Sequence, residues 1–145
     1  MRELEPEDWE QASEIIYREI YPDSDEEKIK DWLKANNNSY SRWFVITVGE
    51  IVGAISWEIE DVDTNKCSLE IGFLAIYRKY QKQGFGRQLI FESLEQVKKI
   101  LPFPLSFVIV MADDKESQKF YQKVLHPYKV TKEPHGRIRF FAKVP

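Results

Sequence analysis

Residues 67–100 are CSLEIGFLAIYRKYQKQGFGRQLIFESLEQVKKI, in which a strand pattern, a glycine-containing turn and a helix pattern follow one another directly. The run 67–76 is mostly apolar and of strand length, so it predicts a buried strand. A basic loop over 77–83 comes next. A helix is predicted from 84 to about 100, because apolar residues recur on one face at Ile90, Leu94, Val97 and Leu101.

Two helices are predicted before this unit. A short strand over 2–4 precedes Pro6 and two acidic residues, which favour the start of a helix. Apolar residues then continue at helical spacing to about residue 20. Ser24 and Glu27 form a capping-box pattern, which predicts a second helix ending near residue 35.

Strands are predicted on both sides of the unit. Branched and aromatic residues over 43–48 and 51–59 predict a β-hairpin, with a second turn over 60–66. After the helix, two prolines precede a buried-type strand over 105–111.

The last part of the chain predicts one helix and one hairpin. Asp113 and Asp114 open a helix that carries an apolar stripe with Tyr121. Two strands, over 128–131 and 137–144, then close the chain around a proline and glycine turn.

Length and composition predict one globular domain covering 1–145. A chain of 145 residues, 43% apolar and 31% charged, can bury about two-thirds of its unfolded surface in one core. Cys67 is the single cysteine and cannot form an internal disulfide. The two histidines lie far from other soft ligands, so no metal site is expected.

Charge and hydropathy restrict the partners and the location. The net charge of −3 argues against nucleic-acid binding and favours a cationic partner. No apolar run approaches the roughly 20 residues of a membrane-spanning helix. Residues 1–8 are acidic and lack the features of a secretory signal. We therefore expect a cytoplasmic protein with no membrane partner.

The segment with the clearest chemical meaning is Gln81-Lys82-Gln83-Gly84-Phe85-Gly86-Arg87. Its glycines allow a tight turn whose N–H groups approach a phosphate at the positive end of the following helix. Four cations lie within ten residues, which predicts an anion site suited to a pyrophosphate: Arg78, Lys79, Lys82 and Arg87. A plain tight turn with a solvated basic face would use the same residues. A dinucleotide fingerprint is disfavoured, because Leu89 stands at its third glycine position.

Three motifs resemble those of the GNAT acetyltransferases. Gln81xxGly84xGly86 followed by Arg87 is similar to motif A, whose loop binds the pyrophosphate of coenzyme A. EIGFLAI, residues 70–76, resembles the EIxFxAI strand of the histone-acetylating branch. Further on, the pattern of Asp114, Ser117, Phe120 and Tyr121 is similar to motif B, usually NxxAxxxY.

The resemblance extends over essentially the whole chain and implies an α/β (α+β) fold. Its features are a mixed, mostly antiparallel central sheet with splayed central strands, flanked by about four helices. The cofactor it implies is acetyl-CoA, held by the loop residues Gln81–Arg87 together with Asp114 and Tyr121. Backbone groups of Leu74, Ala75 and Ile76 would pair with the pantetheine arm and stabilise the oxyanion.

The chemistry implied by the resemblance is direct transfer of an acetyl group to an amine. Glu70 matches the catalytic glutamate of the histone-acetylating branch and is expected to act as a base through water, with Glu58 as the reserve candidate. Tyr121 corresponds to the tyrosine that protonates the departing thiolate. Each residue also has a purely structural alternative. Glu70 suits a strand position that faces solvent or forms an ion pair, and Tyr121 suits the buried stripe of a helix.

Two positions depart from the family pattern. Asp114 stands where Asn is usual, and a carboxylate can only accept hydrogen bonds, so a helix N-cap is its alternative role. His126-Pro127 replaces the Gly-Phe pair that commonly ends this helix, which predicts a different path of the chain from the helix into the last hairpin. Cys67 has no histidine nearby in sequence, so a covalent acetyl-cysteine route is not expected.

The acceptor amine is left open. Asp23, Asp25 and Glu26 favour a cation, which fits a small-molecule amine, a lysine side chain or a protein N-terminus. Tyr21 and Trp32 are candidates to line the acceptor site, although all four tryptophans fit core positions. The alternative functions are a non-catalytic acyl-CoA sensor and an acidic scaffold with a coincidental turn. A homodimer through an edge strand is compatible with the pattern.

Overall fold

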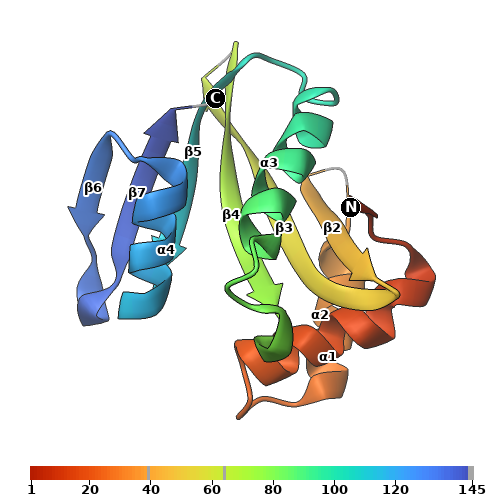
Figure 1. The fold of residues 1–145 in the computed structure, drawn as a ribbon. Helices are drawn as coiled ribbons and strands as arrows, with labels where there is room; N and C mark the ends of the chain where they lie inside the picture. The colour runs from red at the N-terminus through yellow and green to blue at the C-terminus, as the bar shows by residue number, and fades with distance from the viewer. Residues whose placement is uncertain (39, 64, 144–145) are drawn as a thin grey trace. The chain divides into compact units, whose positions relative to one another are not determined.

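The computed structural model describes residues 1–38, 40–63 and 65–143. Within those residues it contains four α-helices and seven strands (Figure 1). In chain order they are β1 (Arg2–Glu3), α1 (Trp9–Glu19), α2 (Glu26–Asn36), β2 (Ser41–Val48), β3 (Glu50–Asp63), β4 (Lys66–Ile76), α3 (Phe85–Lys98), β5 (Leu105–Ala112), α4 (Lys115–Leu125), β6 (Lys129–Lys132) and β7 (Ile138–Lys143).

The strands form one sheet in the order β1-β2-β3-β4-β5-β7-β6. β4 and β5 are parallel, whereas the pairs β1–β2, β5–β7 and β6–β7 are antiparallel. The expected mixed, mostly antiparallel sheet with about four helices is therefore confirmed.

The chain divides into two compact units. The first consists of Met1–Trp57 and Phe73–Ile100, and the second of Glu58–Gly72 and Leu101–Pro145. β3 and β4 contribute residues to both. Each unit is described below by itself, and a single domain over 1–145 stays a prediction.

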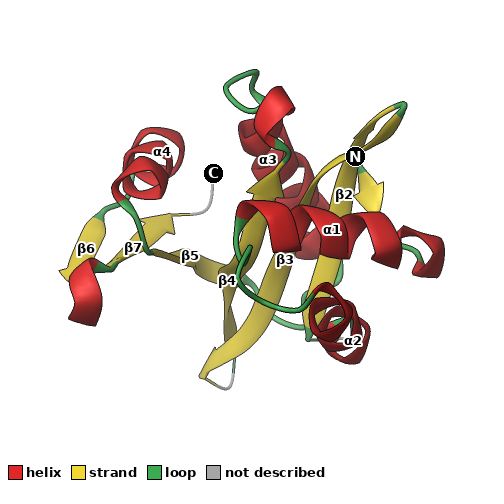
Figure 2. Ribbon diagram, turned by 90° about the horizontal axis from the view of Figure 1, so that it is seen from below, coloured by secondary structure: helices red, strands yellow, loops and turns green. Residues whose placement is uncertain are grey.

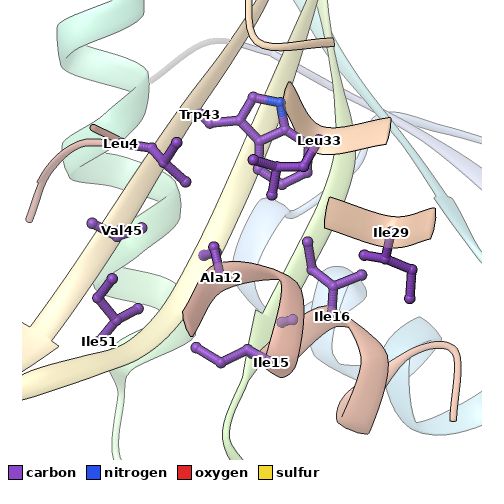
Figure 3. Close-up of a cluster of buried hydrophobic side chains, with 11 residues drawn as sticks. Leu4, Ala12, Ile15, Ile16, Ile29, Leu33, Trp43, Val45 and Ile51 are labelled. Carbon is purple, nitrogen blue, oxygen red and sulfur yellow. The ribbon is translucent and has the colours of Figure 1, made fainter. Parts of the chain in front are cut away.

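Helices α1 and α2 of the first unit pack on one face of its strands (Figure 2). The apolar residues of α1 recur at helical spacing, so Ala12, Ile15 and Ile16 all turn inward (Figure 3). They meet Ile29 and Leu33 of α2 in one buried cluster.

Strand β2 is buried on both faces. Its residues from Trp43 to Ile46 are all buried, but only Trp43 and Val45 belong to the cluster under α1 and α2. Side chains alternate along a strand, so Phe44 and Ile46 face the other way. Helix α3 contacts β2, and Ser93 of α3 accepts a hydrogen bond of 2.7 Å from the buried indole of Trp57 in β3.

The second unit contains the parallel ladder between β4 and β5. That ladder runs from Cys67 opposite Leu105 to Ile71 opposite Val110. β5 continues its pairing with β7 to Ala112, opposite Ile138. Helix α4 packs on β5 and β7 and buries Tyr121.

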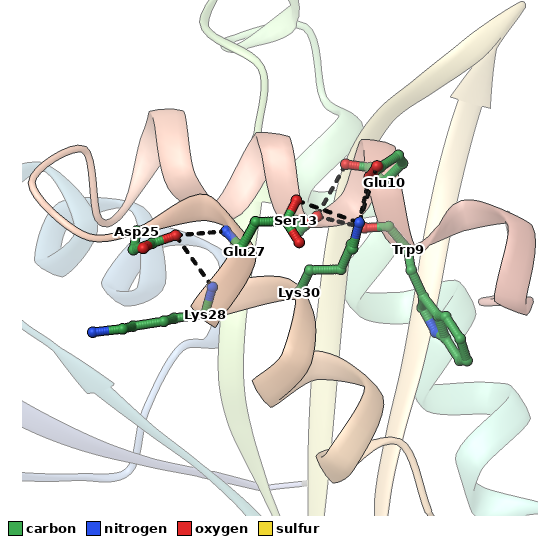
Figure 4. Close-up of polar contacts among 7 residues, drawn as sticks. All are labelled: Trp9, Glu10, Ser13, Asp25, Glu27, Lys28 and Lys30. Atoms are coloured by element: carbon green, nitrogen blue, oxygen red, sulfur yellow. Dashed lines mark hydrogen bonds and ion pairs between the residues drawn. The ribbon is translucent and has the colours of Figure 1, made fainter.

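The predicted start of α2 is wrong by one residue. Asp25, not Ser24, is the N-cap, and its carboxylate accepts hydrogen bonds from the N–H groups of Glu27 and Lys28 at 2.9 and 3.4 Å (Figure 4). A carboxylate at the positive end of a helix is stabilised by charge as well as by hydrogen bonding, so it competes successfully with the neighbouring hydroxyl. Ser24 donates its own N–H to the carbonyl of Tyr21.

The turn predicted over 60–66 is shorter than expected. β3 continues to Asp63 and β4 begins at Lys66, because polar residues are tolerated on a strand whose pairing partner is adjacent in the chain. Thr64 in this turn and Val144 of the predicted last strand lie outside the described residues. No helix in the described part of the chain is long and apolar enough to cross a membrane.

Candidate functional site

The turn before α3 has the backbone conformation that the glycine pattern predicts. Gly84 is the N-cap of α3 with φ of +90°, and Lys82 has φ of +62°. The N–H of Gln88 is the first to bond within the helix, to the carbonyl of Gly84 at 3.0 Å. The preceding N–H groups have no intrahelical acceptor, and Gly84 has no side chain to cap them. They are available to an anion.

Glutamine side chains hold this turn in place. Gln81 donates its amide to the carbonyl of Ile76 at 2.8 Å and to Glu19 at 3.4 Å. Gln83 donates to the carbonyl of Lys79 at 3.1 Å. The bond from Gln81 to Ile76 attaches the turn to the end of β4, and because both glutamine amides are already engaged, the backbone N–H groups are the turn's open amide donors.

Three of the four predicted cations are free of ion pairs in the described part of the chain. Lys79 pairs with Glu50 at 3.3 Å. The guanidinium of Arg87 lies over Phe91, 5.4 Å from the ring centroid, and neither it nor Arg78 nor Lys82 has an ion pair there. A donor set of open N–H groups with unpaired cations fits a pyrophosphate.

The end of β4 lies beyond its ladder with β5. That ladder stops at Ile71, so within the described residues Leu74, Ala75 and Ile76 follow it without a β5 partner. Ala75 and Ile76 are buried, and Leu74 is partly buried. These residues belong to the first unit, whereas the paired part of β4 belongs to the second.

Glu70 is a partly buried carboxylate among other charges of the second unit. Burial raises its pKa above the usual value, and the charges of Glu60 and Glu58 raise it further. Glu60 also shares a hydrogen bond with it, while Arg139 opposes the rise. Glu70 is therefore held closer to neutrality than an ordinary surface glutamate.

Glu60 and Arg139 were not predicted from the sequence. Glu58 and Glu60 are two residues apart on β3, so they share a face of the strand, and that alternation was the available signal. Arg139 lies on β7, far away in sequence, and no local pattern could have associated it with Glu70.

Helix α4 brings Asp114 and Tyr121 into the second unit. The carboxylate of Asp114 accepts hydrogen bonds from the N–H and hydroxyl of Ser117 at 2.8 and 3.2 Å, which makes it the N-cap. Tyr121 is buried, and burial raises the pKa of its phenol, with further contributions from Asp114 and Asp113. His126 ends the helix with φ of +48°, where a glycine would be unstrained.

The sequence matches the model of the Acetyltransferase (GNAT) family over residues 2–126. The match covers most of the chain. This chain belongs to the GNAT acetyltransferase family. It is an N-acetyltransferase that uses acetyl-CoA, and the family acetylates amines. No curated protein matches the sequence significantly.

Solved structures of similar fold support the architecture of this GNAT acetyltransferase. An aminoglycoside 6'-N-acetyltransferase complexed with coenzyme A is 14% identical, with a TM-score of 0.79 over 97% of this chain and 93% of its own. Glucosamine-6-phosphate N-acetyltransferase from Arabidopsis thaliana is 16% identical, with a TM-score of 0.68 over 91% and 93%. The NatC complex bound to Gag peptide and CoA is 11% identical, with a TM-score of 0.67 over 100% of both chains. Their different names show that the fold does not determine the acceptor.

The candidate site residues of this acetyltransferase fall into two groups. The first unit brings together residues 74–76 and the turn 81–87, joined by the bond from Gln81 to Ile76. The second unit holds Glu70, Asp114 and Tyr121. Within the second unit, Glu70 is on the sheet, whereas Asp114 and Tyr121 are on α4.

Proposed function

We propose that this acetyltransferase transfers the acetyl group of acetyl-CoA directly to a primary amine while both substrates are bound. The observation that carries the proposal is the turn before α3, with open N–H groups and unpaired cations at the position of the family's motif A. That donor set supports binding of the cofactor's pyrophosphate by Gln81 to Arg87.

We further assign a role to the end of β4. Backbone groups of Leu74, Ala75 and Ile76 extend beyond the ladder with β5, so they are able to pair with the cofactor's pantetheine arm as an added strand would. A backbone N–H there would stabilise negative charge that develops on the acetyl oxygen. Contact of Asp114 with the cofactor stays a prediction, since its carboxylate already binds Ser117.

Glu70 is assigned as the base that removes a proton from the amine through a water molecule. Its raised pKa makes it a better match to proton transfer near neutral pH than an exposed glutamate. Tyr121 is assigned as the acid that protonates the departing thiolate. A phenol is protonated at neutral pH even at its usual pKa near 10, so it can donate, and burial raises the pKa of Tyr121 further.

The first test is acetyl-CoA binding by calorimetry, followed by release of free thiol in the presence of a panel of amines. Binding with thiol release supports the proposal. Binding without release by any amine would favour an acyl-CoA sensor instead, and a folded sample that does not bind would contradict the cofactor assignment.

Glu70→Gln is the variant that tests the base. The amide is nearly isosteric but cannot accept the proton, so we expect kcat to fall by about 10²–10⁴-fold with acetyl-CoA affinity unchanged. Glu116→Gln is the matched control, because this glutamate is exposed on α4. If the turnover of Glu70→Gln were unchanged between pH 6 and 9, the assignment of Glu70 as the base would be wrong. Glu58 would then be the next candidate.

A homodimer is a further proposal about the assembly. β6 stands at the end of the strand order and carries the exposed side chain of Val130, with Tyr128 just before it. An unpaired edge of this kind can add a strand from a second copy. Light scattering of the purified chain decides between one and two copies.

A further inference from the structure

We propose that the acceptor amine carries an aromatic body, bound by the rings of Tyr21, Trp32 and Phe73, and an ammonium group attracted by neighbouring carboxylates. The inference rests on the proposed function, because it names the substrate class of the same reaction. Every residue that carries it lies in the first unit.

Phe73 of β4 is the centre of an aromatic cluster. The edge-to-face partners of its ring are Tyr21 at 5.7 Å and Trp32 at 4.9 Å between ring centroids. Trp43 of β2 is stacked on Phe73 at 5.9 Å and also meets Trp32 edge to face. Trp43 is fully buried, so it forms the base of the cluster.

The outer rings of the cluster are exposed. Tyr21 is 45% and Trp32 39% accessible to solvent, although both rings are linked to the core through Phe73. Exposed aromatic rings held rigidly by a buried one offer apolar area at a small entropic cost. Phe73 directly precedes Leu74, so the cluster adjoins the strand end to which we assign the acetyl group.

The segment that carries Tyr21 is acidic. Residues 19–27 contain five carboxylates and neither lysine nor arginine. Asp25 caps α2, Glu27 lies near Lys30, and Glu19 accepts from the turn before α3. Asp23 and Glu26 have no ion pair or hydrogen bond of their side chains in the described part of the chain.

This combination selects for an arylalkyl ammonium ion. A ring on the ligand would pack against Tyr21 and Trp32, and its ammonium group would be drawn by the carboxylates and by the negative faces of the rings. An aliphatic diamine would gain the charge without the ring contacts, and a neutral aromatic alcohol would gain the ring contacts without the charge.

Calorimetry with three probes separates these contributions. We expect 2-phenylethylamine to bind at least about tenfold more tightly than butylamine, which lacks the ring, and than 2-phenylethanol, which lacks the charge. Butylamine equal to 2-phenylethylamine would overturn the aromatic part, and 2-phenylethanol equal to it would overturn the ionic part. Acetyl-CoA binding is measured separately, so failure of the proposed function is distinguishable from failure of this inference.

Variants of the cluster give the second arm of the test. Trp32→Ala should weaken 2-phenylethylamine binding about tenfold, leave butylamine within about twofold and leave acetyl-CoA affinity unchanged. Trp32→Phe should retain most of the affinity. Tyr40→Ala is the matched control, because Tyr40 is 71% exposed and outside the cluster. Equal loss for both amines in Trp32→Ala would contradict the assignment, and Tyr21→Ala replaces that variant if it does not fold.

Discussion

At the scale of single residues, the pKa of Glu70 depends on neighbouring charges that shift it in opposite directions. Burial and the carboxylates of Glu60 and Glu58 raise its pKa, while the guanidinium of Arg139 lowers it. A base must be ionised to accept a proton, so activity should rise with pH through the pKa of Glu70. Removing a neighbour should therefore move this rise in a direction set by that neighbour's charge.

Two substitutions test this in opposite directions. Glu60→Gln removes a negative charge, so the pKa of Glu70 falls and the rise in kcat/KM moves to lower pH. Arg139→Gln removes a positive charge, so the rise moves to higher pH. Profiles of kcat/KM between pH 5 and 9 measure both shifts. Shifts of the same sign in the two variants would show that Glu70 does not control the profile.

At the scale of elements, the start of α2 depends on one side chain. Asp25→Ala removes the acceptor for the N–H groups of Glu27 and Lys28, so the free energy of unfolding should fall by about 1 kcal/mol. Ser24→Ala is the control and should have almost no effect. Urea denaturation of both variants checks this, and a larger loss for Ser24→Ala would contradict the cap assignment.

The pairing of β3 with its neighbours depends on Gly53. A Cβ atom at this position would lie 2.3 Å from Cδ1 of Ile76 and 3.2 Å from both Ile46 and the carbonyl of Ala75. Gly53→Ala should therefore lower the free energy of unfolding by about 1–3 kcal/mol, as overpacked cores do. Urea denaturation measures it. Ile76→Val in the same chain should recover part of the loss, whereas no recovery would assign the cost to the backbone of Ala75.

At the scale of the whole molecule, cofactor binding and stability are linked. Acetyl-CoA at about 100 times its Kd should stabilise the protein by about 2.7 kcal/mol, a rise in Tm of about 5–10 °C. Gly84→Ala should abolish most of this rise, because alanine is strained at φ of +90° and would distort the turn to which we assign the pyrophosphate.

Gly49→Ala is the matched control for this experiment. Gly49 also has positive φ, +73°, and open space at its Cβ position, but it lies in the turn between β2 and β3. Both variants should lose similar stability without ligand, and only Gly84→Ala should lose the ligand-induced rise in Tm. The same loss in Gly49→Ala would show that the rise does not depend on the turn before α3.

The sequence by itself determined the elements and the glycine turn before α3. Hydrophobic period is a local property, so the strands around Gly49 and the helices α3 and α4 were predictable within a few residues. Gly84 indicated the position of this turn because glycine readily takes positive φ, here +90°. The N-cap at Asp25 was missed, because two adjacent residues had similar capping preference and charge decided between them.

Only the tertiary structure decided which side chains meet. Arg139 faces Glu70 because β7 pairs with β5 and β5 with β4, contacts that join residues about 70 positions apart. Trp32 fitted a core position in the sequence, yet it is 39% exposed, although its ring contacts those of Phe73 and Trp43. The burial and the pKa of a side chain depend on contributions from many residues that are distant in the sequence. No local sequence pattern contains those contributions.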